Sequence, residues 1–588
     1  MHLRSLLAFI CTSALLLASA SAAEAKRKPN VLVILADDEG WGDLRVNGNT
    51  DVSTPRIDSL AKNGALLEHF YVCPVCATTR AEFLTGRYHL RGGVHGVSSG
   101  QERLNIDEKT VADTFKAAGY ATGAFGKWHN GMQYPYHPCG RGFEEYYGFC
   151  SGHWGDYFDA PLEHNGLPVQ GKGFIIDDLT DHAIDFMEKN QDKPFFCYVP
   201  FNTPHFPLQV PDRFFTKFAS YDPQMRARNP SQEKISETRA ILAMTENIDW
   251  NVGRLLDQLD KLHLAEDTIV IYFSDNGPQT WRWNGGMKGK KGSTDEGGVR
   301  APFVIRWPGH IQGGLRLPQI AGAIDLLPTL TDLAQVLSVS TKRLDGVSLK
   351  PLLTQTAKDW PDRMIFSEWI GKTSLRTQHY RLDNAHALFD MDVDLPQDHD
   401  ISKEHPAETA KLVESMTAMR AEMFAKEKDA RPFTVGYPEF PVTQLPARDA
   451  EANGEIKRSS KAPNCSYFTH WVNPNDTITW DVDVATAGQY EAVIYYAVPE
   501  ADLGSTVALS FQGKSVQGKV TVANDPPLHG QEHDRSPREQ ESFVKDWKPM
   551  TLGTVELQKG RGQLTLRAPQ IPGKSVMEFR AMFLTLKK

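Results

Sequence analysis

Cysteine is scarce in this chain, which has seven in 588 residues. That number is too small for a disulfide framework. Cys139 and Cys150 could pair in an oxidising compartment, but the cysteines could equally be buried thiols. Cys73 and Cys76 have the spacing of half a zinc site, and no second Cys-x-x-Cys completes it. Six remain once the N-terminal segment described below is removed: Cys73, Cys76, Cys139, Cys150, Cys197 and Cys465.

A strong excess of one charge is also lacking. The chain has 64 lysines and arginines against 73 acidic residues, and its bases are scattered, whereas a phosphate backbone attracts clustered bases. Nucleic acid is therefore not an expected partner. With 40 % apolar and 23 % charged residues, the composition is that of a globular chain with a large core. Its length favours two domains.

Long apolar runs are missing beyond the N-terminus. The first residues combine a basic start with an apolar run from Leu6 to Ala18, and small residues follow at Ala20, Ala23 and Ala25. This pattern predicts a signal peptide over 1–25 and export to the periplasm or the medium. The run is shorter than the roughly 20 residues of a membrane span, so we expect no stable membrane anchor.

Helical and strand patterns alternate after the signal peptide. The apolar run at 30–36 is typical of a strand buried on both faces. Alternation of this kind indicates an α/β fold with a mostly parallel central sheet flanked by helices. The expected helix and strand pairs are 111–118 with 121–125, 179–190 with 194–199, and 241–262 with 268–273.

The pattern changes after a helix expected at 405–428. A proline-rich stretch suggests a linker, and seven short alternating segments then predict an all-β sandwich. These segments are 477–484, 489–497, 506–511, 519–522, 550–557, 562–567 and 579–586. The chain thus divides into a signal peptide (1–25), a catalytic domain (26–435), a linker (436–455) and a sandwich domain (456–588).

Acidic residues follow two of the expected strands. Asp37 and Asp38 end the first, and Asp275 and Asn276 follow the strand at 268–273. Carboxyl ends of parallel strands gather ligands, and oxygen donors of this kind suit Ca²⁺ or Mg²⁺ rather than zinc. A single Asp-Asp pair is more often a solvated turn. Two such clusters together predict a cation site.

Basic and imidazole side chains stand at matching positions. Lys127 and His129 follow one strand, His205 follows another, and Lys291 precedes a glycine-containing loop. Each alone has an ordinary structural explanation. Together they suit an anionic ester group, because lysines neutralise its oxygens and histidines move protons.

The residues Cys76-Ala77-Thr78-Thr79-Arg80, followed by Phe83 to Arg87, resemble the signature of formylglycine-dependent sulfatases. Further segments in that family's order are 29–43, 126–129, 274–277, 291–300 and 324–329, so the resemblance spans about 29–430. It implies an alkaline-phosphatase-like fold and a sulfuric ester hydrolase, with Cys76 oxidised to formylglycine by a formylglycine-generating enzyme.

The resemblance also implies roles for single residues. Ca²⁺, in preference to Mg²⁺, would be held by Asp37, Asp38, Asp275, Asn276 and the modified Cys76. Arg80 would position the modified side chain. The residues lining the sulfate pocket would be Lys127, His129, His205 and Lys291, with His205 as the acid and His129 as the base.

Two positions depart from the family pattern, because Thr78 stands where proline is usual and Thr79 where serine is frequent. If the modifying enzyme does not accept this sequence, Cys76 stays a thiol and the chain is a catalytically silent, metal-dependent binding protein for sulfated glycans. Phosphodiesterases and phosphonate hydrolases of the same fold are a further alternative. A thiol redox role for Cys73 and Cys76 leaves the acidic clusters unexplained.

The sandwich resembles carbohydrate-binding modules of secreted polysaccharide enzymes. Tyr467, Trp471 and Trp480 could stack on sugar rings or fill the core of the domain. If they bind sugar, the expected substrate is a sulfated polysaccharide or its oligosaccharides. No motif indicates which sugar, which sulfate position or which oligomeric state.

Overall fold

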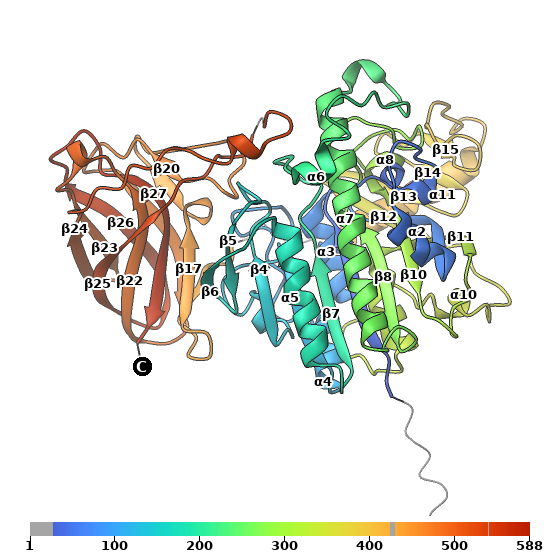
Figure 1. Ribbon diagram of the computed structural model, residues 1–588, viewed down its shortest axis with the longest axis horizontal. Coiled ribbons are helices and arrows are strands. Elements are labelled where there is room, and N and C mark those ends of the chain that lie inside the picture. The colour runs from blue at the N-terminus through green and yellow to red at the C-terminus, as the bar shows by residue number, and fades with distance from the viewer. Residues whose placement is uncertain (1–26, 424–429, 539, 588) are drawn as a thin grey trace, which may run out of the picture.

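The computed structural model describes residues 27–423, 430–538 and 540–587. The signal peptide expected at 1–25 lies outside them. Figure 1 shows two parts side by side, a sheet covered by helices and an all-β sandwich formed by the C-terminal segment. No helix in the described residues has the length and apolar character needed to cross a membrane.

The first part is built on an 11-stranded sheet. Its centre is parallel, because β1 pairs in parallel with both β7 and β8, and β7 with β3. Antiparallel strands flank this centre, so the sheet is mixed. The order is β11 (Leu315–Gly322), β2 (Ala65–Tyr71), β10 (Phe303–Arg306), β8 (Thr268–Ser274), β1 (Asn30–Ala36), β7 (Phe195–Pro200), β3 (Ala121–Lys127), β4 (Glu145–Phe149), β5 (Pro161–His164), β6 (Leu167–Gln170), with β9 (Arg300–Ala301) on β2.

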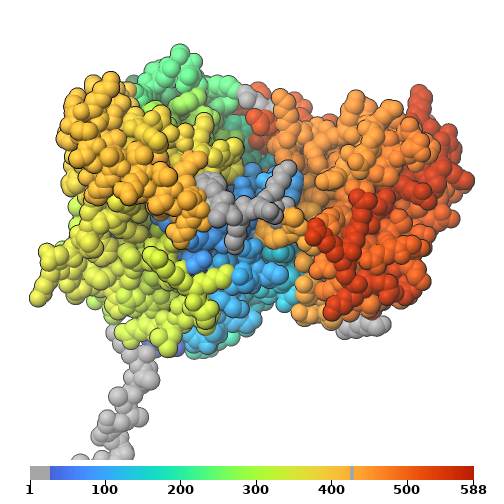
Figure 2. All heavy atoms as spheres, turned by 180° about the vertical axis from the view of Figure 1, so that it is seen from behind, coloured from blue at the N-terminus to red at the C-terminus, as the bar shows by residue number. Residues whose placement is uncertain are grey.

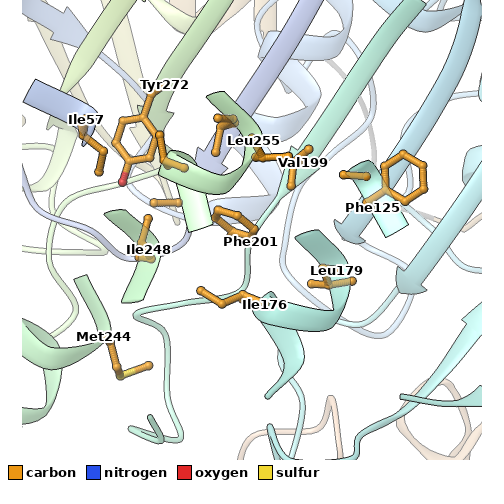
Figure 3. Close-up of a cluster of buried hydrophobic side chains, with 14 of the residues drawn as sticks. Ile57, Phe125, Ile176, Leu179, Val199, Phe201, Met244, Ile248, Leu255 and Tyr272 are labelled. Carbon is orange, nitrogen blue, oxygen red and sulfur yellow. The ribbon is translucent and has the colours of Figure 1, made fainter. Parts of the chain in front are cut away.

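Side chains of β1 alternate between two apolar cores. Leu32 and Ile34 pack in the core under α2 (Pro55–Lys62), α5 (Ile175–Lys189) and α7 (Ile235–Lys261). Figure 3 shows other side chains of this core, among them Ile57, Leu179 and Leu255. Val31 and Val33 pack on the opposite face. That face is covered by α3 (Cys76–Thr85), α4 (Val111–Ala117) and α9 (Leu326–Leu333). The predicted α/β fold is therefore confirmed.

A small antiparallel sheet extends this part. Its strands are β12 (Ile365–Trp369), β13 (Lys372–Arg376), β14 (Tyr380–Leu382) and β15 (Leu388–Asp390), and α11 (Pro406–Met423) packs on it. The helix expected at 405–428 is thus present up to Met423, beyond which the chain is not described until residue 430. Three one-turn helices complete the first part: α6 (Asp212–Phe215), α8 (Glu296–Val299) and α10 (Lys350–Leu353).

The second part consists of two six-stranded sheets. Trp471 and Trp480 are fully buried between them, and Tyr467 is also buried. The two tryptophans therefore fill the core and are not available to stack on sugars, whereas Tyr467 packs against Trp547 with ring centroids 4.9 Å apart. One sheet contains β16 (Phe433–Val435), β18 (Glu451–Asn453), β21 (Thr477–Val484), β23 (Thr506–Phe511), β24 (Lys514–Lys519) and β26 (Gly560–Gln570). The other contains β17 (Val442–Pro446), β19 (Lys457–Arg458), β20 (Phe468–Thr469), β22 (Gly488–Ala497), β25 (Lys548–Leu557) and β27 (Glu578–Leu586).

The structure differs from the sequence prediction at two places in this part. The segment 436–455, expected to be a linker, supplies β17 and β18, and β16 just before it also joins a sheet. Its prolines are tolerated because β17 pairs on one side only. The strand expected at 519–522 lies earlier, at β24. Gln512 and Gly513 both have positive φ and form a two-residue hairpin turn, so the next strand starts at once.

The two parts are packed against each other along one side (Figure 2). Gln444 of β17 donates from Nε2 to Glu163 Oε2 of β5 at 2.8 Å. Arg448 donates to Ser151 Oγ at 2.9 Å and pairs with Glu102 at 3.4 Å. The sandwich is therefore joined to the sheet by buried polar contacts. The six cysteines of the described chain are all free thiols, including Cys139 and Cys150.

Candidate active site

Four acidic and amide side chains meet where two parallel strands end. β1 and β8 pair in register, with Ala36 opposite Ser274, so the residues that follow them come together. The N–H of Asp38 donates to Asp275 Oδ1 at 3.2 Å, and Asn276 Nδ2 donates to Asp38 Oδ1 at 2.8 Å. The two acidic clusters of the sequence therefore form one buried group: Asp37, Asp38, Asp275 and Asn276.

Two lysines compensate part of this negative charge. Lys127 Nζ lies 2.5 Å from Asp37 Oδ2, and Lys291 Nζ lies 2.7 Å from Asp38 Oδ1. Burial raises the pKa of Asp37, but Lys127 and His205 outweigh it and hold that pKa well below its usual range. Burial likewise lowers the pKa of Lys291, and Asp38 overcomes this effect and raises it. Asp37 and Asp38 are therefore held in their charged forms.

Asp275 is held by a buried arginine. Arg80 donates from Nε and Nη2 to Asp275 Oδ2 at 3.1 and 2.8 Å, and from Nη1 to the carbonyl of Lys127 at 2.7 Å. Burial and the neighbouring carboxylate of Asp37 nevertheless raise the pKa of Asp275 to about 7. A cation beside Asp275 would favour its charged form.

Cys76 begins α3 directly beside these carboxylates. Ligand atoms of Asp37, Cys76 and Asp275 lie within 4.8 Å of one another. Burial raises the pKa of the Cys76 thiol, while Lys127 and Lys291 oppose the rise. Thr79 fixes the turn before it, because its hydroxyl donates to the carbonyl of Asp275 at 2.6 Å and accepts from the N–H of Cys73 at 2.8 Å. The structure thus brings the signature cysteine to the acidic group.

The oxygen donors fit a hard divalent cation. Asp37 Oδ1 and Asn276 Oδ1 are buried and accept no hydrogen bond from the described residues. A buried polar atom without a partner carries a free-energy cost that a bound cation would remove. Oxygens of carboxylates and amides are the ligands that Ca²⁺ and Mg²⁺ take.

Both predicted histidines are buried near this group and donate to backbone carbonyls from opposite ring nitrogens. His205 Nδ1 donates to the carbonyl of Phe206 at 2.7 Å, and its Nε2 lies 3.6 Å from Asp38 Oδ2, where that carboxylate favours a proton on Nε2. His129 Nε2 lies 2.7 Å from the carbonyl of Val97, which leaves the lone pair on a buried Nδ1 without a partner. Burial lowers the pKa of both rings, most strongly that of His129.

A third histidine at the site was missed from the sequence. The ring of His153 stacks on His205 with centroids 5.8 Å apart, and its buried Nε2 has no partner among the described residues. The sandwich holds this loop, since Asn464 Nδ2 lies 3.4 Å from His153 Nδ1 and Cys465 donates to the His153 carbonyl. His153 follows a strand, in a segment that contains glycine. This position is the one sequence signal that could have identified it.

A pocket of about 200 Å³ opens beside the site. It includes Phe206 and Lys290, the sequence neighbours of His205 and Lys291. Trp281 also lines it, and Lys290 Nζ lies 5.7 Å from the centre of that ring. The sandwich contributes Gln540 and Glu541 to the same wall. A ligand in this pocket would therefore contact both parts of the chain.

Glu296, in the loop after Lys291, is a buried carboxylate surrounded by arginines. Arg381 Nη2 lies 2.7 Å and Arg376 Nε 3.8 Å from Glu296 Oε2, and Arg300 is 3.5 Å from Oε1. Burial raises the pKa of Glu296, but Arg381 and Arg376 outweigh it and hold the pKa at about 2. This cluster fixes the loop that presents Lys291.

Glu296→Gln is expected to lower the free energy of unfolding by about 3 kcal/mol near neutral pH, because it leaves buried arginines without their anion. The folded pKa lies below the unfolded one, so this contribution is present above about pH 4.5 and is lost as the pH falls towards 2. Urea unfolding across this range measures it. Glu556→Gln, at an exposed ion pair, is the control and should have little effect.

The fold and the site together indicate the family to which the chain belongs. The mixed sheet and its strand-end cluster define a hydrolase of the alkaline-phosphatase-like superfamily. The chain belongs to the sulfatase family, because the model of that family matches residues 29–336. A second model, for the C-terminal region of N-sulphoglucosamine sulphohydrolase, matches residues 290–426. The predicted family and the predicted enzyme class, a sulfuric ester hydrolase, are thus confirmed.

The relatives are sulfatases. Human arylsulfatase A is 33 % identical over 415 residues, which cover 62 % of this chain and 77 % of that protein. Human N-acetylgalactosamine-6-sulfatase is 29 % identical over 371 residues, with 57 % and 67 % covered. The crystal structure of Ps i-CgsB in complex with k-i-k-neocarrahexaose is 31 % identical, has a TM-score of 0.61, and covers 67 % of this chain and 93 % of its own.

Proposed function

We propose that this sulfatase is exported and removes sulfate from a sulfated polysaccharide or its oligosaccharides, through a formylglycine made from Cys76. The observation that carries the proposal is the position of Cys76, at the start of a buried helix beside Asp37, Asp275 and two lysines. Relatives named for a sulfated sugar or solved with a carrageenan oligosaccharide support a glycan substrate.

In this proposal Asp37, Asp38, Asp275, Asn276 and residue 76 hold Ca²⁺. The cation supplies positive charge that acidifies a hydroxyl of the hydrated aldehyde and offsets charge on sulfate. Arg80 fixes the position of Asp275 by its two hydrogen bonds. A divalent oxygen site explains the two buried acceptors that the described residues leave without a donor.

The other side chains bind sulfate and move protons. Lys127 and Lys291 lie beside Cys76 and would neutralise the non-bridging oxygens. His205 would deliver a proton to the leaving oxygen of the sugar. His129 would take a proton from the side chain at position 76, and its free Nδ1 lone pair supports this role. His153, stacked on His205, would hold that ring in place.

The test is direct. The full chain is co-expressed with a formylglycine-generating enzyme, the mass of the Cys76 peptide is measured, and sulfate release is followed on a panel of sulfated oligosaccharides. We expect conversion of the thiol to the aldehyde and release of sulfate. An unconverted peptide together with no release would instead leave a binding protein. Release from phosphate diesters in preference to sulfate esters would favour the phosphodiesterase alternative.

For the sandwich we propose sugar binding in a cavity between the two parts of the chain. The cavity measures about 470 Å³, a size that suits a small ligand. Trp154 from the catalytic part and Tyr495, Trp547 and Phe583 from the sandwich line it. It also includes Ser151 and Gly155, on either side of His153 in the chain. Sugar bound there would therefore contact the loop that carries His153.

Arg580 gives this cavity a preference for anions. It donates to the carbonyl of Ser466 at 2.8 Å and forms no ion pair with any carboxylate in the described chain. Its guanidinium lies 5.9 Å from the centre of the Trp154 ring. Burial lowers its pKa, although a guanidinium keeps its proton. An uncompensated cation beside aromatic rings suits a sulfated sugar.

Arg580→Gln is expected to raise KM for a sulfated oligosaccharide by about tenfold, the cost of one charge-assisted hydrogen bond, with kcat unchanged. Hydrolysis of a small aryl sulfate should stay as in the wild type, since that substrate does not reach the cavity. Arg567→Gln, an exposed residue on β26 of the other sheet, is the matched control. Equal KM values for both variants would contradict sugar binding at this place.

A further inference from the structure

A second group of buried ligand-type side chains lies behind the signature cysteine. It consists of Cys73, Glu82, His89 and Glu368, each at most 5 % exposed, and we call it the Cys73 cluster. Ligand atoms of Cys73, Glu82 and His89 lie within 4.8 Å of one another, and Glu368 Oε2 is 3.9 Å from His89 Nε2. The cluster joins the turn before α3, α3 itself, the loop after it and β12.

The tautomer of His89 suits a metal ligand. Its Nδ1 lies 2.8 Å from the carbonyl of Val94 and must donate to it, so Nε2 carries the lone pair. That Nε2 forms no hydrogen bond with the described residues and faces Glu368. A ring that donates one N–H to a backbone carbonyl and offers the other nitrogen is the arrangement of metal-bound histidines.

One carboxylate of the cluster, Glu82, has no cation beside it. Glu82 forms no ion pair with any described lysine or arginine, and its charged neighbours are acidic. Burial therefore raises the pKa of Glu82 to about 8, and it raises that of Glu368 as well, with Arg420 opposing. Glu296, equally buried, has its pKa lowered by arginines instead. The Cys73 cluster thus has room for a positive charge that the protein does not supply.

A similar cluster elsewhere has the opposite tautomer. His137, Cys150 and Glu163 are also buried and within 4.8 Å of one another. The N–H of Cys139 donates to His137 Nδ1 at 3.2 Å, so the other nitrogen carries a proton and faces Glu163 Oε1 at 3.3 Å. The Nδ1 lone pair is already used, and the protonated Nε2, which forms no hydrogen bond with the described residues, offers none to a metal. It provides a control within the same chain.

We propose that Cys73, Glu82, His89 and Glu368 bind one zinc ion. A thiolate, an imidazole and carboxylates are the donors that zinc takes, whereas Ca²⁺ takes oxygen alone. Two nitrogen or oxygen ligands of a tetrahedral zinc lie about 3.4 Å apart, so Glu368 Oε2, at 3.9 Å from His89 Nε2, would move closer on binding and complete the group formed by Cys73, Glu82 and His89. On binding, the Cys73 thiol loses its proton to solvent and sulfur bonds to the ion.

The ion would tie α3 to β12. Glu82 lies in the middle of α3, and its Oε1 accepts from the N–H of His89 at 3.2 Å. Glu368 lies in β12, where its Oε1 accepts from the N–H of Gly371 at 2.7 Å. The Glu82 carboxylate also accepts from the Cys73 thiol, a hydrogen bond that the ion would replace when the thiol loses its proton. The site would therefore fix the helix that starts at Cys76, and it does not depend on what the chain hydrolyses.

The experiment measures zinc in the full chain carrying Cys76→Ala, because an unmodified Cys76 beside Asp37 and Asp275 could bind zinc itself. After incubation with zinc and dialysis against calcium buffer, elemental analysis should find about one zinc per chain. Adding Cys73→Ser or His89→Gln should lower retention by about tenfold or more. Adding Cys150→Ser, in the control cluster, should leave retention unchanged.

Cobalt gives a readout that needs no variant in the cluster. Co²⁺ bound to the Cys76→Ala chain should show the near-ultraviolet absorption of a thiolate-to-cobalt bond, and Cys150→Ser should keep it. If Cys73→Ser does not fold, His89→Gln and this spectrum decide. No retained zinc in the Cys76→Ala chain, cobalt without the thiolate absorption, or zinc retention unaffected by both cluster variants would each overturn the proposal.

Discussion

Cys76→Ser is expected to stop turnover after a single transfer of sulfate. A serine hydroxyl at this position has the same neighbours, Asp37, Asp275 and the two lysines, and can attack sulfur. It has no second hydroxyl on the same carbon, so nothing expels the sulfate from the resulting ester. The protein should gain the mass of one SO₃ group, and steady-state hydrolysis of a sulfated oligosaccharide should fall by about 10⁴-fold or more.

Intact mass spectrometry after incubation with substrate checks this result. Cys76→Ala has no nucleophile and should show neither the added mass nor turnover. Cys139→Ser, at a half-buried free thiol outside both the site and the sugar cavity, should turn over like the wild type. Sustained turnover by Cys76→Ser would contradict a hydrated aldehyde as the reacting group, because an alcohol would then suffice.

The strand-end cluster could be predicted because local rules place it. Apolar runs identify β1 and β8, and parallel pairing brings the residues after them to one edge of the sheet. Asp38 and Asp275 therefore meet although they lie 237 residues apart in the sequence. The same rule places Lys127 at the end of β3. Cys76 was identified by the family signature and not by hydrophobic periodicity.

Other features depend on tertiary contacts that no local pattern encodes. His153 reaches the site because the sandwich holds its loop through Asn464 and Cys465. The proline-rich stretch forms strands because β27 and β21 offer free edges to it. The alternating pattern around Trp480 fits a strand whether the ring binds sugar at the surface or lies in the core. The ring is buried because the second sheet packs over it. Contacts between segments that are not neighbours in the sequence determine all three.

Asp275→Asn, a substitution in the acidic group, is expected to cause the second large loss of activity. This change keeps the shape of the side chain but removes one charged ligand of the proposed cation and the anionic partner of Arg80. We expect kcat/KM for sulfate ester hydrolysis to fall by about a thousandfold or more. The buried guanidinium of Arg80 would be left with Asp37, 3.9 Å away, as its nearest carboxylate.

Stability should respond to calcium in the same experiment. A ligand that binds the folded state at a hundred times its Kd stabilises it by about 2.7 kcal/mol, so the wild type should melt at a higher temperature in Ca²⁺ than in chelator. Asp275→Asn should lose most of this difference. In chelator the variant should be closer to the wild type, because the pKa of Asp275 near 7 leaves that carboxyl partly protonated without a cation.

Asp178→Asn, a buried aspartate that accepts from Tyr147, is the control and should keep the full calcium shift. An Asp275→Asn protein with the wild-type calcium shift and activity would show that the cation is held elsewhere.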